Sequence, residues 1–247
     1  PDIKNEILFN DHEIKFNYNK NGYEIIGGGK ILIQNNFDKI NYLIKENNDK
    51  LNFETNLEVK KNNFVLDFLN FKKIDKNFSS ISINGIKKKD KSILINKFLI
   101  KDKKNFIKLK NISLTKNYKL TKIQNGKFDY VDRENKRNIF NVNYKNKNYS
   151  FIGKELNANN LIKRFINSND KKKFDVFKKK LQIDINLDKV ILDDEYHIYN
   201  FNGNISFENG EVILAELIGS FSDHKQLKYT VYSSDGQKIS TFFSDEA

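Results

Sequence analysis

The segment Leu181-Gln-Ile-Asp-Ile-Asn-Leu187 decides the fold, because apolar and polar residues alternate along it without interruption. The apolar members fall two residues apart, so they share one face of an extended strand, whereas the polar members share the other. Similar runs, separated by turn signals, follow to the end of the chain. One face of the resulting sheet must be covered, and the pattern leaves open whether a second sheet or a bound apolar ligand covers it.

Turns between the runs are marked by six Asn-Gly or Asp-Gly pairs, which use six of the eleven glycines. Such pairs adopt the positive φ of type I′ hairpin turns. Asn209-Gly210 and Asp235-Gly236 lie between alternating runs and predict hairpins directly, whereas Asn202-Gly203 lies inside a run and is interpreted as a turn or a bulge. The other pairs are Asn21-Gly22, Asn84-Gly85 and Asn125-Gly126.

Alternating runs also fill the upstream part of the chain, and the single proline, Pro1, interrupts none of them. We therefore predict a mainly β protein, a long antiparallel meander curled into an open groove or half-barrel with two short helices. A chain of 247 residues with 38% hydrophobic residues is long and apolar enough to fold around a core. The upstream runs span residues 14–18, 51–59, 93–100, 106–114, 118–131 and 149–153.

Two segments depart from the strand period and predict the helices. Phe37, Ile40, Leu43 and Ile44 recur at helical spacing, which predicts a short helix near residues 36–47. A second stripe, Leu161, Ile162, Phe165 and Ile166, predicts a helix over residues 157–167. We accordingly divide the chain into an N-terminal β-groove segment, residues 1–153, and a second part, residues 154–247, in which the helix precedes a β-meander. Both parts are expected to contribute to one continuous sheet.

The net charge is +12, from 44 Lys and Arg against 32 Asp and Glu. Such an excess is typical of proteins that bind nucleic acid or a membrane surface. Only three of the 44 are Arg, namely Arg133, Arg137 and Arg164, and Asn and Ile are abundant. This usage also fits codon drift in an AT-rich genome, so the function of the charge stays open.

The chain has no cysteine, which excludes disulfides, zinc–thiolate sites and thiol catalysis. No run approaches the roughly 20 apolar residues of a membrane span, and no signal peptide is recognisable. The sequence begins at Pro1 and contains no methionine, so we expect it to be an internal piece of a longer protein.

Several short motifs carry residue types used in active sites, and we interpret each as structural. Gly27-Gly28-Gly29 lacks the residues of a phosphate loop and precedes a strand-like run, so it predicts a strand bend or bulge. Ser222-Asp-His224 places triad residues side by side, where they cannot aim at one another. Asp193-Asp-Glu195 falls where a turn is expected. The histidines are too scattered for a zinc motif. We expect no catalytic residue, metal site or cofactor, and no enzymatic activity.

From Tyr149 onward the chain resembles a known family. Tyr149-Ser-Phe-Ile-Gly-Lys-Glu-Leu-Asn-Ala-Asn-Asn-Leu-Ile-Lys-Arg-Phe165 looks like the strand and helix entry of AsmA-like proteins of the YhdP and TamB type. The later order is similar too: a long strand, an acidic turn, Phe201-Asn-Gly-Asn-Ile-Ser-Phe207, the hairpin at Asn209-Gly210, Leu217-Ile-Gly-Ser-Phe221, and a closing Ser244-Asp-Glu-Ala247 where many members carry Asp-Ala-Gly. The resemblance covers about residues 147–247.

Membership would imply a very long periplasmic protein of a Gram-negative bacterium, anchored in the inner membrane by an N-terminal helix. Its sheets would curl into an apolar groove that carries phospholipid toward the outer membrane. This chain differs from the pattern in lacking the anchor and in its load of Lys and Asn. We expect the anchor to lie outside this fragment.

On this hypothesis the apolar side chains of the last third face phospholipid acyl chains. A strand of about ten residues spans roughly 33 Å, similar to an acyl chain with its headgroup. Each methylene taken from water contributes about 0.8 kcal/mol, so a continuous apolar surface suffices. The alternative is that the same residues form a closed core. The candidates are Ile183, Ile185, Leu187, Ile205, Phe207, Leu214, Tyr229 and Val231.

Two other functions stay open on the sequence alone. The first is a scaffold for envelope or outer-membrane protein assembly, which would recruit envelope proteins through exposed strand edges. The second is a lysine-rich binder of anionic polymers, whose binding would depend steeply on salt. Nucleic acid is not expected as a partner, because Arg is scarce and no RNA-recognition signature accompanies the aromatic residues.

Overall fold

The computed structural model describes residues 7–47, 49–73, 78–161, 180–209, 211–221, 225–234 and 237–245. Fifteen strands form one sheet in the order β1-β2-β3-β4-β7-β8-β9-β10-β11-β12-β13-β14-β15-β16-β17. The sheet is open and is not closed into a barrel, as the alternating pattern predicted. The chain divides into two compact units, residues 1–122 (unit 1) and 123–247 (unit 2). The boundary expected after residue 153 falls inside a strand of unit 2.

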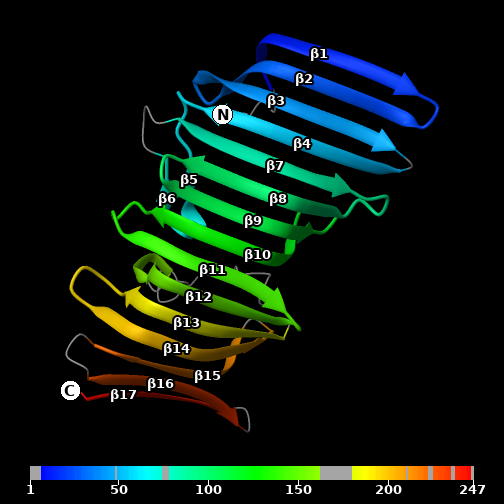
Figure 1. Cartoon of the computed structure of the whole chain (residues 1–247). Helices are drawn as coiled ribbons and strands as arrows, with labels where there is room; N and C mark the ends of the chain where they lie inside the picture. The colour runs from blue at the N-terminus through cyan, green and yellow to red at the C-terminus, as the bar shows by residue number, and fades with distance from the viewer. Residues whose placement is uncertain are drawn as a thin grey trace, which may run out of the picture. The chain divides into compact units, whose positions relative to one another are not determined.

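Unit 1 is a run of strands that lie side by side in chain order (Figure 1). A small separate hairpin, made of β5, the 3-10 turn η1 and β6, interrupts the run between β4 and β7. The strands of the main run are β1 (Phe9–Asn19), β2 (Gly22–Ile33), β3 (Asn36–Asn47), β4 (Lys50–Val59), β7 (Ser79–Lys87), β8 (Ile93–Asp102) and β9 (Asn105–Leu114). The small hairpin consists of β5 (Val65–Leu66), η1 (Asp67–Leu69) and β6 (Phe71–Lys72).

Unit 2 continues the same pattern of chain-order neighbours, and β10 spans the boundary between the units. Its strands are β10 (Leu120–Val131), β11 (Arg137–Lys145), β12 (Asn148–Asn157), β13 (Leu181–Ile191), β14 (His197–Glu208), β15 (Glu211–Ser220), β16 (Gln226–Ser234) and β17 (Gln237–Ser244). None of the helices that the structure describes is long and apolar enough to cross a bilayer.

The antiparallel prediction is wrong at one pair, because β12 and β13 run parallel and make the sheet mixed. Tyr149 pairs with Ile183 and Phe151 with Ile185. Parallel neighbours need a crossover connection, and 23 residues separate these strands, from 158 to 180. Of the helix predicted over 157–167, Asn157 instead ends β12 and residues 159–161 are helical. Residues 162–167 lie outside the described residues.

The helix predicted near residues 36–47 is wrong, since this segment is strand β3. Ile40 and Ile44 pair with Gly29 and Ile25 of β2 on one side, and with Leu57 and Phe53 of β4 on the other. Residues at even positions of β3 face one side of the sheet, whereas Phe37 and Leu43 face the other. A strand with apolar residues on both faces imitates helical spacing, and two paired neighbours decide its conformation.

The strands on either side of positions 209–210 and 235–236 pair antiparallel, as predicted for hairpins, and so do the strands that meet at 21–22. Asn84-Gly85 and Asn125-Gly126 instead lie inside β7 and β10, so a turn there is wrong. Asn202-Gly203 lies inside β14 next to a shift of register, which confirms the bulge. Gly203 has a φ of 143°, and a Cβ there would lie 1.9 Å from the carbonyl oxygen of Glu216.

Candidate functional site

Seven of the eight predicted groove residues share one face of unit 2. Directly opposite residues of paired strands present their side chains on the same face. Ile183 pairs with Ile205, Ile205 with Ala215, and Ala215 with Val231. A second row runs from Ile185 through Gly203 and Leu217 to Tyr229. Leu187 and Phe207 lie two residues along the strands from members of these rows, on the same face.

Leu214 is the exception, and its placement among the groove candidates is wrong. It pairs with Ser206 on β14 and with Tyr232 on β16, so it faces the opposite side of the sheet from Ile205. The cause is a shift of register between Ser206 and Phe207, which leaves Ile213 unpaired. An extra residue in one strand reverses the faces of the residues that follow it.

The seven residues differ in how far protein covers them. Leu187 and Val231 are 2% and 1% exposed, and Ile183 and Phe207 are also buried. Ile185, Ile205 and Tyr229 are half-buried. Four of the seven therefore behave as an ordinary core, which is the alternative that the sequence leaves open, and the other three keep part of their apolar surface accessible.

Aromatic rings extend the apolar face of unit 2 across β10, β11 and β12. The rings of Phe128 and Phe140 stack with centroids 4.4 Å apart, and those of Phe140 and Phe151 with centroids 6.3 Å apart. Gly153 makes room for this stack, since a Cβ there would lie 2.6 Å from the Cβ of Phe140. Burial raises the pKa of the Tyr149 phenol, whose oxygen accepts a hydrogen bond from the backbone N–H of Ile123 at 3.1 Å.

A larger apolar face, which the sequence reasoning did not select, lies in unit 1. One row of paired residues runs Ile25, Ile44, Phe53, and a parallel row runs Leu57, Ile81, Ile100, Ile107. The alternation at 14–18 and 51–59 predicts two of these strands. What it could not show is that apolar residues share one face on seven neighbouring strands, because that depends on the register of every pair.

Exposure of the apolar residues on this unit 1 face is highest on β1, and Ile100 of β8 and Ile107 of β9 are each only 2% exposed. Ile14 and Phe16 on β1 are 62% and 61% exposed. Ile25, Ile44 and Phe53 are half-buried. Apart from β5, η1 and β6, the described residues of unit 1 form no element outside the sheet. The face is thus a broad apolar surface that the described part of the unit leaves partly open.

One end of the unit 1 face is polar and buried. Asp38 is 4% exposed, and its carboxylate accepts hydrogen bonds from the backbone N–H groups of Lys60, Lys61 and Asn62 at 2.9, 3.0 and 3.2 Å. The Asn62 side chain donates a fourth at 2.7 Å. Burial raises the pKa of Asp38, but these hydrogen bonds outweigh it, so the net pKa lies below the usual value.

Unit 2 has a corresponding buried carboxylate. Asp132 is 6% exposed and accepts hydrogen bonds from the side chains of Asn157 and Asn138 at 2.7 and 3.2 Å. Its other oxygen accepts from the backbone N–H groups of Glu134 and Lys136. In each unit a charged group is thereby satisfied by protein donors, so it fixes a loop and offers no free acid or base.

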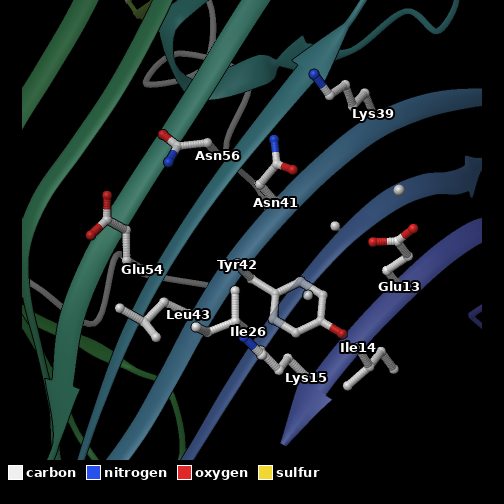
Figure 2. Close-up of a pocket in the computed structure, with 13 residues that line it drawn as sticks. Glu13, Ile14, Lys15, Ile26, Lys39, Asn41, Tyr42, Leu43, Glu54 and Asn56 are labelled. Atoms are coloured by element: carbon white, nitrogen blue, oxygen red, sulfur yellow. The ribbon is translucent and has the colours of Figure 1, made fainter.

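The polar face of β1–β4 carries an open depression of about 1080 Å³ (Figure 2). Gly27, Gly28 and Gly29 form part of its floor, opposite a bulge in β1 between Asn10 and Glu13, which confirms the strand and bulge reading of this cluster. The side chains of Asn41 and Tyr42 occupy the space that Cβ atoms on Gly28 and Gly27 would need. The glycines therefore serve close packing.

The depression does not gather acid and base groups. Glu13 and Glu54 lie on opposite sides of it in Figure 2, on β1 and β4, which are three strand spacings or roughly 14 Å apart. His12 contacts only Tyr42 among the side chains of β3, with 3.2 Å between its Nε2 and the phenol oxygen. The described residues contain no group of three side chains that could hold a metal ion.

The other predicted motifs take the places expected of structural elements or lie outside the description. Asp193-Asp-Glu195 forms the turn between β13 and β14, in which the Asp193 carboxylate accepts hydrogen bonds from the N–H groups of Glu195 and Tyr196. Burial, with Lys189 and Lys136 nearby, lowers the pKa of His197. Ser222, Asp223 and His224 lie outside the described residues.

No family model, curated protein or solved structure matches this chain. The resemblance to AsmA-like proteins therefore stays a prediction. The candidate site rests on the two apolar sheet faces alone, and of these the unit 1 face is the more accessible.

Proposed function

We propose that this chain is a segment of a periplasmic AsmA-like protein that carries phospholipid along an apolar β-groove between the inner and outer membranes. The role is non-enzymatic, and the longer protein is anchored in the inner membrane outside this segment. The observation that carries the proposal is the apolar face of unit 1, which continues from β1 to β9 through directly paired residues and is partly open on β1 to β4.

Acyl chains suit this face because its contacts are apolar and do not select a particular chemical group. The row of Ile25, Ile44 and Phe53 offers branched and aromatic surface and no hydrogen-bonding group. Each acyl methylene that leaves water contributes about 0.8 kcal/mol, so a chain of about 16 carbons needs no polar contact to bind. Weak, non-directional contacts also let a lipid slide from one strand to the next.

A photo-crosslinking experiment tests the proposal at matched positions. Phe53→benzoylphenylalanine places the probe on the apolar face of β4, and Asn52→benzoylphenylalanine places it on the next residue, which faces the opposite side. We expect phospholipid adducts at position 53 at least about ten times more often than at position 52, in protein expressed in cells. Native mass spectrometry of the gently purified chain should show co-purified phospholipid. Equal labelling at both positions, with no bound lipid, rules the proposal out.

A specific observation also favours assembly of envelope proteins as a second function. β1 and β17 are the edge strands of the sheet, and both expose large apolar residues, including Tyr18 at 76% and Phe242 at 64%. Unpaired edge backbone can accept a further strand from a partner. A protein partner crosslinked through β17, in a chain that binds no lipid, would favour this role.

A further inference from the structure

The polar face of unit 1 gathers lysines where β8 and β9 lie side by side. Lys97 of β8 is directly opposite Lys110 of β9. Lys101 and Lys108 lie on the same face of these strands, opposite Phe106 and Leu99. We call these four lysines the basic patch. It faces away from Ile100 and Ile107, whose side chains belong to the apolar face.

Among the residues that β7, β8 and β9 place on its face, the basic patch has no acidic neighbour. The remaining residues that β7, β8 and β9 place there are Ser80, Ser82, Asn84, Ile86, Leu94, Leu99, Phe106 and Ser113. Among the residues that the structure describes, none of the four lysines forms an ion pair, whereas Lys39 and Lys45 on β3 of the same face pair with Glu58 and Glu24.

Such an arrangement is unfavourable in the isolated chain. Directly opposite residues of an antiparallel pair have Cβ atoms about 5 Å apart, and like charges there repel one another. An anionic surface that supplies the missing counter-charge therefore relieves the repulsion between Lys97 and Lys110. Codon drift explains many lysines, but it does not explain why β4 carries Glu54 and Glu58 on this face while the charged residues of β8 and β9 there are all lysine.

The chemistry around the patch favours a lipid bilayer over a nucleic acid. All four cations are Lys, which act as point charges and lack the bidentate fork with which Arg reads bases and phosphates. Half-buried Leu99 and Phe106 lie between them, and long lysine stems beside apolar groups are typical of membrane interfaces. A broad sheet face is also too wide to enter a major groove.

We propose that the basic patch docks unit 1 on the surface of a bilayer rich in anionic phospholipid. This inference uses the face opposite to the acyl-binding one and does not rest on the proposed transport. Docking in this orientation leaves the apolar face turned away from the headgroups, so the two surfaces act independently.

Vesicle binding by the full chain tests the inference. The probe is vesicles of phosphatidylcholine with 30% phosphatidylglycerol, compared with pure phosphatidylcholine, a composition chosen for the assay. Lys97→Gln with Lys110→Gln should weaken binding to anionic vesicles about 30-fold, which corresponds to roughly 1 kcal/mol for each lysine at an anionic surface. The matched control, Lys39→Gln with Lys45→Gln, removes the same charge from the same face and should change binding less than about threefold. Salt of 0.5 M should abolish the difference.

Three results overturn the inference: no preference for anionic vesicles, an equal loss in both double variants, or tighter patch-dependent binding to a 30-nucleotide single strand or duplex, a length chosen for the assay. Thermal unfolding should show the patch variant to be at least as stable as the parent, since repulsion is relieved. Ile44→Asp changes the apolar face and should keep vesicle binding even if the variant no longer co-purifies with phospholipid. The two measurements therefore distinguish a failure of docking from a failure of transport.

Discussion

Asp38 stabilises unit 1 only as a carboxylate, because the four hydrogen bonds that it accepts come from donors alone. A protonated carboxylic acid or an amide at position 38 would carry a donor group of its own. That group would point at one of the N–H donors that now bind the carboxylate. The residue is nearly fully buried, so water cannot replace a lost partner. Loop residues 60–62 therefore depend on a single charge.

Asp38→Asn should lower the free energy of unfolding by about 2 kcal/mol at pH 7, the range expected for hydrogen bonds to a charged group. The pKa of Asp38 is depressed in the folded state, so its stabilisation is complete above the unfolded carboxyl pKa of about 3.9 and is lost as the pH falls through the lower folded value. The stabilities of parent and variant in urea unfolding should accordingly converge as the pH falls below about 3.9 and through the folded value.

Asp49→Asn provides the comparison for Asp38→Asn. Asp49 forms an exposed ion pair with Lys89 at 2.8 Å, and such pairs contribute little to stability. An equal effect of both substitutions, or a gap between parent and Asp38→Asn that does not narrow as the pH falls below about 3.9, would show that the buried charge is not what holds the loop.

At the scale of the element, alternation in the sequence was enough to predict strands but not their register. The runs at 51–59 and 181–187 are strands, because a period of two has no other regular interpretation. Leu214 was assigned to the wrong face, since the bulge at Ile213 leaves no mark in an otherwise regular apolar run. β3 was read as a helix because apolar residues on both of its faces hide the period of two.

The parallel pairing of β12 and β13 was also invisible in the sequence, because both orientations bury the same residues. Ser150 pairs with Asp184 in the parallel register. A Ser150→Cys and Asp184→Cys variant should therefore form an intramolecular disulfide under mild oxidation, which removes two hydrogens from the intact mass. The chain has no other cysteine to interfere.

Ser150→Cys with Asp188→Cys tests the register of this pair. Asp188 faces the same side of β13 but lies four residues, or about 13 Å, farther along the strand, beyond the reach of a disulfide. Crosslinking of the second pair in preference to the first would mean that the strands are antiparallel or shifted.

At the scale of the whole molecule, the unusual property is how much apolar surface the described residues leave accessible. Folded monomers rarely expose large contiguous apolar patches, and those that do use them for binding. The candidate surface could be predicted in unit 2, where the alternation is cleanest. In unit 1 it depends on seven strands being in register, which no local pattern encodes.

The native chain should consequently enhance the fluorescence of the dye ANS, and added phosphatidylglycerol should displace it. Ile14→Gln with Phe16→Gln should reduce this enhancement by about half, because both side chains are exposed on the apolar face of β1. Lys15→Gln with Asn17→Gln, on the opposite face of β1, should leave it unchanged. A native chain without dye fluorescence would mean that the face is covered.

Apart from β4 and β7, every pair of neighbours in the sheet is also consecutive along the chain. Most strand pairs can therefore form from local contacts, which favours rapid folding, whereas β4 with β7 and β12 with β13 must wait for longer connections to close. The same order allows evolution to lengthen or shorten the sheet by whole hairpins. Duplicating one hairpin would add about 10 Å of width and one more stretch of each face, without disturbing the register of the rest.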